Sequence, residues 1–174
     1  LSAKVKLISV EPEEVKGATK KLQSQFDEKN IVEDLVRVGV KGNINPYSYY
    51  TSSPNDKIES VESVVKEVHT KYSESVILAS SELDFDLIYV HDWVGMSAGL
   101  ELKKRLKKPL IIHIHSLDTD RIGMNHKSWV YDIEKEAISK ADAVITVSKY
   151  TADCIASQYS ESVKNISIVY PGID

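Results

Sequence analysis

The stretch that decides the fold is residues 87–120, which read LIYVHDWVGMSAGLELKKRLKKPLIIHIHSLDTD. One apolar run ends in His91 and Asp92, a helical pattern follows, and a second apolar run carries His113 and His115. Two strands joined through a helix in this way are parallel, so their carboxyl ends lie at the same edge of one sheet. Because open α/β sheets bind ligands at that edge, the stretch predicts both a fold class and the place of a site.

Strand and helix patterns alternate along the rest of the chain as well. The apolar runs LIYV, LIIHI, AVITV and ISIV are continuous, which is typical of strands covered on both faces of a parallel sheet. The sequence therefore predicts an α/β fold, a Rossmann-like parallel sheet with helices on both faces. The predicted strands are residues 4–10, 32–38, 87–90, 109–114, 143–147 and 166–169, and the predicted helices are residues 56–80, 94–106, 128–139 and 149–159.

Composition narrows the class of protein. The 174 residues are 42% hydrophobic and 28% charged, with a net charge of −4, which disfavours a nucleic-acid-binding protein. Cys154 is the only cysteine, so no intramolecular disulfide can form, and we expect it to be a small buried hydrophobic residue. No apolar run has the length of a membrane span and no signal peptide is evident, so the predicted location is the cytoplasm.

The residue pair His91 and Asp92 stands where a strand meets the start of a helix. A helix N-terminus carries free N–H groups and partial positive charge, which favour anionic or hydroxyl-rich ligands. Asp92 could equally be an N-cap alone, with Trp93 in the core. The histidine at the strand end favours a site over that simpler interpretation.

The next strand carries two histidines on one face, because side chains alternate along a strand. His115 is expected at the carboxyl edge beside His91, which makes it the candidate catalytic residue. His113 is expected deeper in the sheet, where a hydrogen-bonded structural role is the better prediction.

Residues 116–127 form a predicted loop of twelve residues, longer than most connections from a strand to a helix. Its length suggests a function, and Arg121 is its candidate binding residue. Asp120 and Arg121 could also be a solvated ion pair.

A basic cluster ends the preceding helix. We expect it to complement the helix dipole in solvent, although it could also contact an anionic membrane surface. Its members are Lys103, Lys104, Arg105, Lys107 and Lys108.

Several motifs together resemble a known family. The order YVHDW, a helix, PLIIHIHS, then IEKEAISKADAVITVSKYTADCI and ISIVYPGID resembles the N-terminal domain of retaining glycosyltransferases of the GT-B fold, glycosyltransferase family 4. The HDW element is most similar to glycogen and starch synthases. The resemblance covers residues 86–174, and its combined spacing is specific.

The resemblance implies a two-domain enzyme that transfers a sugar, with glucose favoured by HDW, and with retention of configuration. A nucleotide sugar such as UDP-glucose or ADP-glucose would be held by a C-terminal domain, and a sugar or glucan acceptor would lie on the N-terminal domain. By the resemblance, His91 and Asp92 line the cleft, His115 contacts the transferred sugar, and no metal or cofactor is needed. The further candidate substrate-binding residues are Trp93, Ser116, Arg121 and Ser148.

The chain also departs from the family pattern. The family's first strand and its Gly-Gly loop have no counterpart, and the C-terminal donor domain is not in the sequence. We expect residues 1–168 to be the acceptor-side domain and residues 169–174 to begin the interdomain linker. On this prediction the main partner is the protein's own C-terminal domain, and the chain alone does not catalyse transfer.

Two other interpretations stay open. The pattern His113-x-His115-x-x-Asp118 resembles the ligand set of a metal-dependent hydrolase, to which His91, Asp92 and His126 could add. Alternatively, the domain could be a non-catalytic binding module with a GT-B-like fold.

Overall fold

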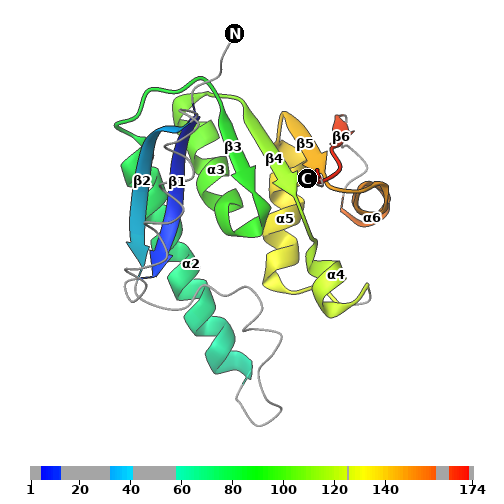
Figure 1. Cartoon of the computed structure of the whole chain (residues 1–174). Helices are drawn as coiled ribbons and strands as arrows, with labels where there is room; N and C mark the ends of the chain where they lie inside the picture. The colour runs from blue at the N-terminus through cyan, green and yellow to red at the C-terminus, as the bar shows by residue number, and fades with distance from the viewer. Residues whose placement is uncertain (1–4, 13–31, 41–57, 125, 160–164, 173–174) are drawn as a thin grey trace. The chain divides into compact units, whose positions relative to one another are not determined.

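The computed structural model describes residues 5–12, 32–40, 58–124, 126–159 and 165–172 (Figure 1). The chain divides into two compact units, Leu1–Phe85 and Asp86–Asp174. None of the helices in these ranges combines the length and the hydropathy that a membrane crossing demands.

The first unit contains two parallel strands and a long helix. Strand β1 (Val5–Pro12) pairs with β2 (Val32–Val40), and helix α2 spans Ile58–Ser80. Residues three or four positions apart on α2 are buried, as the amphipathic pattern predicts. They are Val65, Val68, Tyr72 and Val76.

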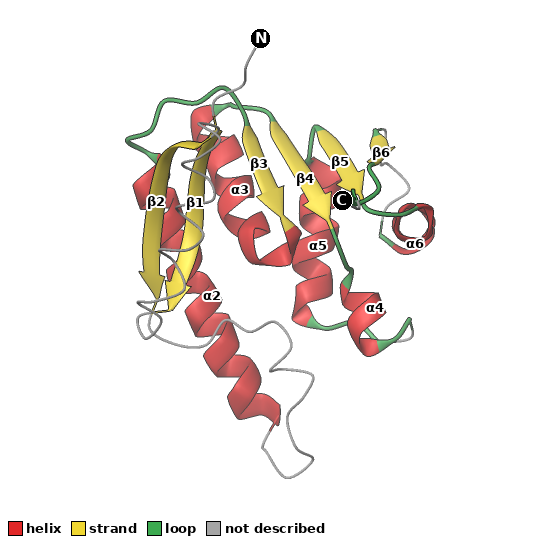
Figure 2. Cartoon of the chain, viewed as in Figure 1, coloured by secondary structure: helices red, strands yellow, loops and turns green. Residues whose placement is uncertain are grey.

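The second unit is built around a four-stranded parallel sheet in the order β3-β4-β5-β6 (Figure 2). This confirms the predicted α/β fold with a parallel sheet. The strands are β3 (Ile88–His91), β4 (Leu110–Ile114), β5 (Ala143–Thr146) and β6 (Ile166–Ile168). The helices are α3 (Asp92–Leu106), α4 (Asp118–Ile122), α5 (Trp129–Lys140) and α6 (Lys149–Gln158).

One face of this sheet packs closely against α3. Val90 on β3 lies against two glycines of that helix: a Cβ added to Gly95 would be 2.9 Å from Val90 Cγ1, and one added to Gly99 would be 2.7 Å from Val90 Cγ2. The same face of β4 is completely buried, because Leu110, Ile112 and Ile114 are each 0% exposed. The two glycines therefore let the helix approach the sheet more closely than any larger residue would allow.

The C-terminal end of α6 contacts the first turn of α5. The rings of Tyr131 and Tyr159 lie 4.7 Å apart, and the Tyr131 hydroxyl donates to the carbonyl oxygen of Gln158 at 2.7 Å. Cys154, on α6, is buried as predicted.

The opposite face of the sheet is more open. Along β4 the alternate residues Ile111 and His113 are only half-buried, and on β3 Tyr89 and His91 are exposed. The histidines singled out in the sequence therefore lie on the accessible face.

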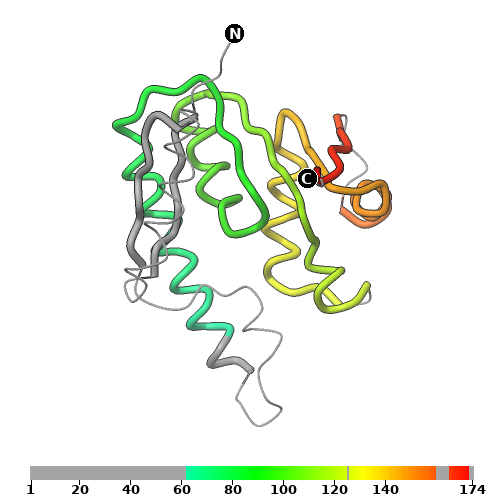
Figure 3. Tube along the Cα trace, viewed as in Figure 1, coloured from blue at the N-terminus to red at the C-terminus, as the bar shows by residue number. Residues whose placement is uncertain are grey.

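The connection from β4 to α5 differs from the predicted loop. Within residues 116–127, the chain forms the short helix α4 before it reaches α5, as the trace in Figure 3 shows. The Asp120 carboxylate accepts a hydrogen bond from the backbone N–H of Leu117 at 2.9 Å, which stabilises the first turn of α4. Asp120 is thus partly a helix-capping residue.

Candidate functional site

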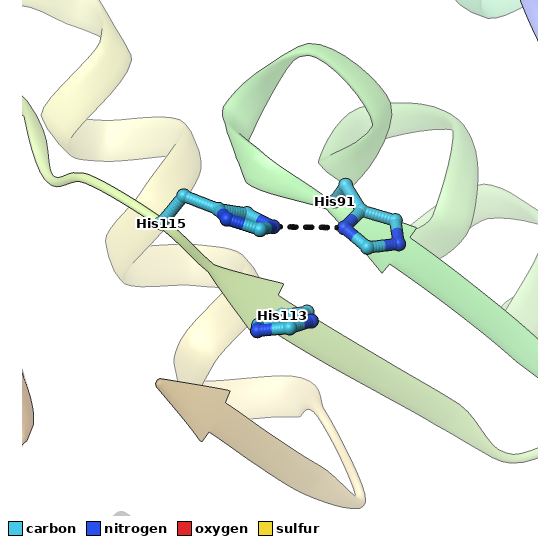
Figure 4. A group of neighbouring side chains, drawn as sticks. All are labelled: His91, His113 and His115. Atoms are coloured by element: carbon cyan, nitrogen blue, oxygen red, sulfur yellow. Dashed lines mark hydrogen bonds between the residues drawn. The ribbon is translucent and has the colours of Figure 1, made fainter. Parts of the chain in front are cut away.

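Three histidines meet at the carboxyl edge of the sheet (Figure 4). His91 is the register partner of His113 across β3 and β4, and His115 follows two residues later on the same side. His91 Nδ1 and His115 Nε2 are 2.9 Å apart and share a hydrogen bond. One nitrogen of each of the three rings lies within 4.8 Å of the others. We call His91, His113 and His115 the histidine cluster.

Two of the three ring pairs in the histidine cluster are stacked. The centroids of His113 and His115 are 4.4 Å apart at an interplanar angle of 26°, and those of His91 and His115 are 5.2 Å apart at 27°. The hydroxyl of Tyr89 hydrogen-bonds to His113 Nδ1 at 2.8 Å. Tyr89 therefore fixes the innermost ring of the cluster.

The environment of the cluster disfavours positive charge. Partial burial lowers the pKa of His91, and the neighbouring His115 lowers it further, while Asp92 acts in the opposite direction. Burial also lowers the pKa of His113, with added effects from His115 and His91. Both imidazoles are thus favoured in the neutral form, which can donate and accept hydrogen bonds.

Asp92 joins the ends of the two strands. Its carboxylate accepts hydrogen bonds from the backbone N–H of His115 at 2.8 Å and of Ser116 at 3.4 Å. Its φ angle is +51°, a conformation that an aspartate tolerates better than most residues do. The N-cap of α3 is His91, without a side-chain cap, so the alternative that Asp92 is only an N-cap is wrong. The carboxylate turns back to the β4 end instead.

The segment after His115 is anchored by a buried ion pair. The Arg121 guanidinium donates to the Glu134 carboxylate at 2.6 Å and to the Ser116 hydroxyl at 2.8 Å. The side chains of Arg121 and Glu134 are 7% and 1% exposed, so this is not the solvated Asp120–Arg121 pair of the alternative interpretation. Burial raises the pKa of Glu134 to about 7, against the opposing effect of Arg121.

Asp118 is part of the same scaffold. It is 0% exposed, and its carboxylate accepts hydrogen bonds from the backbone N–H of Ser128 at 2.9 Å and from its hydroxyl at 2.7 Å. Neither Asp118 nor the exposed His126 belongs to the group of potential metal ligands among the described residues. The ligand set proposed for a metal-dependent hydrolase is therefore not assembled as the sequence pattern suggested.

Three other predicted substrate-binding residues are engaged in the scaffold. Trp93 is 3% exposed and packs edge to face against Trp129. Ser148 is the N-cap of α6, and its hydroxyl accepts from the backbone N–H of Thr151 at 3.1 Å. Ser116 accepts from Arg121, as described above. Binding roles for these residues stay predictions.

The predicted basic cluster is partly neutralised. Lys103 forms an ion pair with Asp142 at 2.7 Å and also donates to the carbonyl oxygen of Lys140 at 2.8 Å. Arg105 pairs with Glu101 at 2.6 Å. These contacts fit the expected solvated helix end, and a membrane contact stays untested.

The sequence pattern did not group His113 with His91 and His115 in the site, and it did not single out Tyr89 or Glu134; the hydrogen-bonded structural role expected for His113 stays a prediction. The signal that could have found Tyr89 is the alternation of side chains along a strand. Tyr89 and His91 are two residues apart and therefore lie on one face of the sheet. His113 and His115 are also two residues apart and share a side in the same way. Aligning the two parallel strands by their ends would have placed all four side chains together.

The parallel sheet defines a Rossmann-like domain, and the polar cluster lies at the carboxyl edge, where sheets of this class bind ligands. A family model described as Glycosyltransferase Family 4 matches residues 68–174, more than half of the chain. The chain belongs to glycosyltransferase family 4, which confirms the resemblance. An uncharacterized glycosyltransferase of Methanocaldococcus jannaschii is 27% identical over 93 residues, which are 52% of this chain and 24% of that protein.

The fold is similar to those of solved GT-B glycosyltransferases. Sucrose-phosphate synthase from Thermosynechococcus elongatus matches with a TM-score of 0.59 and 15% identity, over 96% of this chain and 47% of that one. Arabidopsis thaliana UGT89C1, complexed with UDP, matches with a TM-score of 0.62 and 9% identity, over 97% of this chain and 43% of that one. At these identities the similarity shows the fold alone. The chain spans less than half the length of each.

Proposed function

We propose that this chain is the acceptor-side domain of a retaining glycosyltransferase, which transfers a sugar from a nucleotide sugar to a sugar or glucan acceptor. The single observation that carries the proposal is the position of His115. In a family 4 chain, this exposed side chain stands at the carboxyl edge of the sheet beside His91, and its backbone is held by Asp92. That edge is where α/β sheets of this kind bind ligands.

In the proposed reaction, His115 positions the transferred sugar through a hydroxyl group and does not attack it. Its hydrogen bond to His91 orients the ring, and a neutral imidazole can donate to one partner while it accepts from another. Positioned groups of this kind stabilise the positive charge that develops at the sugar carbon as the diphosphate departs. Basic groups and helix dipoles of a donor domain would stabilise the departing diphosphate.

The choice of donor rests on two indications. The HDW element of residues 91–93 resembles glycogen and starch synthases, which favours glucose as the transferred sugar. A solved structure with the same fold contains UDP, which supports a nucleotide-linked donor such as UDP-glucose or ADP-glucose. The reaction as proposed needs no metal and no further cofactor.

The proposal also assigns a partner and a location. The partner is a C-terminal nucleotide-sugar-binding domain of the same protein, so we expect the 174-residue chain to be inactive alone. The proposed location is the cytoplasm.

The test is a transfer assay with a longer protein that contains this chain and the proposed donor domain. UDP-glucose and ADP-glucose are offered separately with an oligoglucan acceptor, and the anomeric configuration of the product is read by NMR. Transfer with retention supports the proposal, and inversion would contradict it. Hydrolysis of the donor without transfer to any sugar acceptor would also contradict it.

A further inference from the structure

We infer that the histidine cluster, His91, His113 and His115, is a binding site for one divalent transition-metal ion of the zinc type. The family resemblance implies no metal for sugar transfer, and this site concerns binding by the chain itself. An ion held by His91 and His115 would replace their mutual hydrogen bond, so the metal and the transferred sugar are alternative occupants of the cluster. The inference does not rest on the proposed function.

The backbone places three imidazoles within reach of one ion. His113 on β4 and His115, the residue after the end of β4, place two rings on one side, and the register partner of His113, His91 on β3, supplies the third. Zn–N bonds are about 2.0–2.1 Å, so two nitrogens in a tetrahedral shell are roughly 3.3 Å apart. The nitrogens of the cluster lie within 4.8 Å of one another, and the stacked rings would have to rotate out of their stack for their in-plane lone pairs to meet at one ion.

The ligand chemistry selects the kind of ion. Imidazole nitrogen suits Zn²⁺, Ni²⁺ and Cu²⁺, whereas Mg²⁺ and Ca²⁺ require oxygen ligands. The Oδ1 atom of Asp92 accepts from the backbone N–H groups of His115 and Ser116, and Asp92 is outside the group of potential metal ligands among the described residues. Its negative charge stays close to the cluster and favours a bound cation without supplying a ligand.

The histidine cluster is accessible from solvent, and its neutral imidazoles can bind an ion without losing a proton. His91 and His115 are exposed, so an ion can reach the cluster from solvent, and water can complete the coordination shell. The hydrogen bond between His91 Nδ1 and His115 Nε2 would be lost, and its proton would move to the other nitrogen of the donor ring, so that both neutral imidazoles present a lone pair to the ion. Three histidine ligands with one open position form a common arrangement in zinc proteins.

The test is isothermal titration of the metal-free 174-residue chain with Zn²⁺, Ni²⁺ and Mg²⁺. We expect one Zn²⁺ or Ni²⁺ per chain and no binding of Mg²⁺. The visible spectrum of the chain with Co²⁺ should show a coordinated ion that excess Zn²⁺ displaces. Absence of Zn²⁺ binding, or equally strong Mg²⁺ binding, would overturn the inference.

Variants show whether the cluster is the site. Loss of an outer-shell partner costs about 10–100-fold in metal affinity, so loss of a ligand in His113→Gln should weaken Zn²⁺ binding by at least about 100-fold. The matched control is His126→Ala, an exposed histidine outside the cluster, which should bind as the parent does. Equal Zn²⁺ binding by the parent and His113→Gln would mean an adventitious ion only and would overturn the inference. If His113→Gln fails to fold by circular dichroism, His115→Gln is the second variant with the same expected result.

Discussion

The Asp92 carboxylate accepts a hydrogen bond from the backbone N–H of His115 at 2.8 Å, across the carboxyl ends of two neighbouring parallel strands. Asp92 holds this position with a φ angle of +51°. Asp92 thus has a left-handed backbone conformation, and its carboxylate binds the end of the neighbouring strand. This contact fixes the backbone of His115.

We predict that Asp92→Ala is destabilised by about 2–3 kcal/mol, because it loses a hydrogen bond to a charged group and keeps an unfavourable φ. Asp92→Asn keeps an acceptor oxygen and tolerates positive φ, so its loss should stay below about 1 kcal/mol. Urea denaturation of both variants measures the difference. Equal loss in the two variants would show that the hydrogen bond to His115 contributes nothing.

The packing of α3 on the sheet gives a second prediction. A Cβ at position 99 would be 2.7 Å from Val90 Cγ2 and 3.1 Å from Leu110 Cδ1, so Gly99→Ala should cost about 1–3 kcal/mol despite the helix propensity of alanine. Gly172→Ala is the control, since nothing lies within 4 Å of its added Cβ. Thermal denaturation checks both. The double variant Val90→Ala/Gly99→Ala should be more stable than the sum of its single changes predicts.

The buried ion pair of Arg121 and Glu134 gives a third prediction. Glu134→Ala removes the acceptor of Arg121 and of the Tyr159 hydroxyl, and we expect a loss of about 3–5 kcal/mol. On the same helix, Glu136 pairs with Lys140 at the surface, so Glu136→Ala should cost no more than about 1 kcal/mol. Denaturation midpoints of the two variants provide the comparison. Similar midpoints would mean that the Arg121–Glu134 pair does not anchor the segment after His115.

The histidine cluster should make the free energy of unfolding depend on pH. The pKa of His113 is lowered in the folded chain by burial, then by His115 and His91. The unfolded chain therefore takes up a proton first as the pH falls, and stability decreases from about pH 7 to about pH 5. With a chelator present, this decrease in the free energy of unfolding should be smaller in His113→Gln. An unchanged decrease would exclude His113 as one of its causes.

Much of the second unit could be predicted from the sequence, because its strands are short and apolar and two of its helices begin at recognisable serine caps. Ser128 and Ser148 are the observed N-caps of α5 and α6. The meeting of His91 and His115 at the carboxyl edge of the sheet also followed from topology. The helix α4 was not predicted, because a five-residue helix has no apolar periodicity to reveal it.

The partners of polar side chains could not be predicted. Arg121 and Glu134 are thirteen residues apart, and only the fold shows that they form a buried pair and do not face solvent. Likewise, Asp92 has the sequence pattern of an N-cap, and its actual partner is on the next strand. The sequence predicts the depth of His113 along its own strand, whereas its register partner His91 is known only from the pairing of the two strands.

The central claim is that His115 contacts the transferred sugar. The most direct test is turnover by His115→Ala in a longer protein with its donor domain, compared with His126→Ala as the control. We expect the rate of glycosyl transfer to fall by more than about tenfold in His115→Ala, as for the loss of a positioning group, with an unchanged circular dichroism spectrum. His126→Ala should keep the parental rate. An unchanged rate in His115→Ala would contradict the claim and remove His115 from the site.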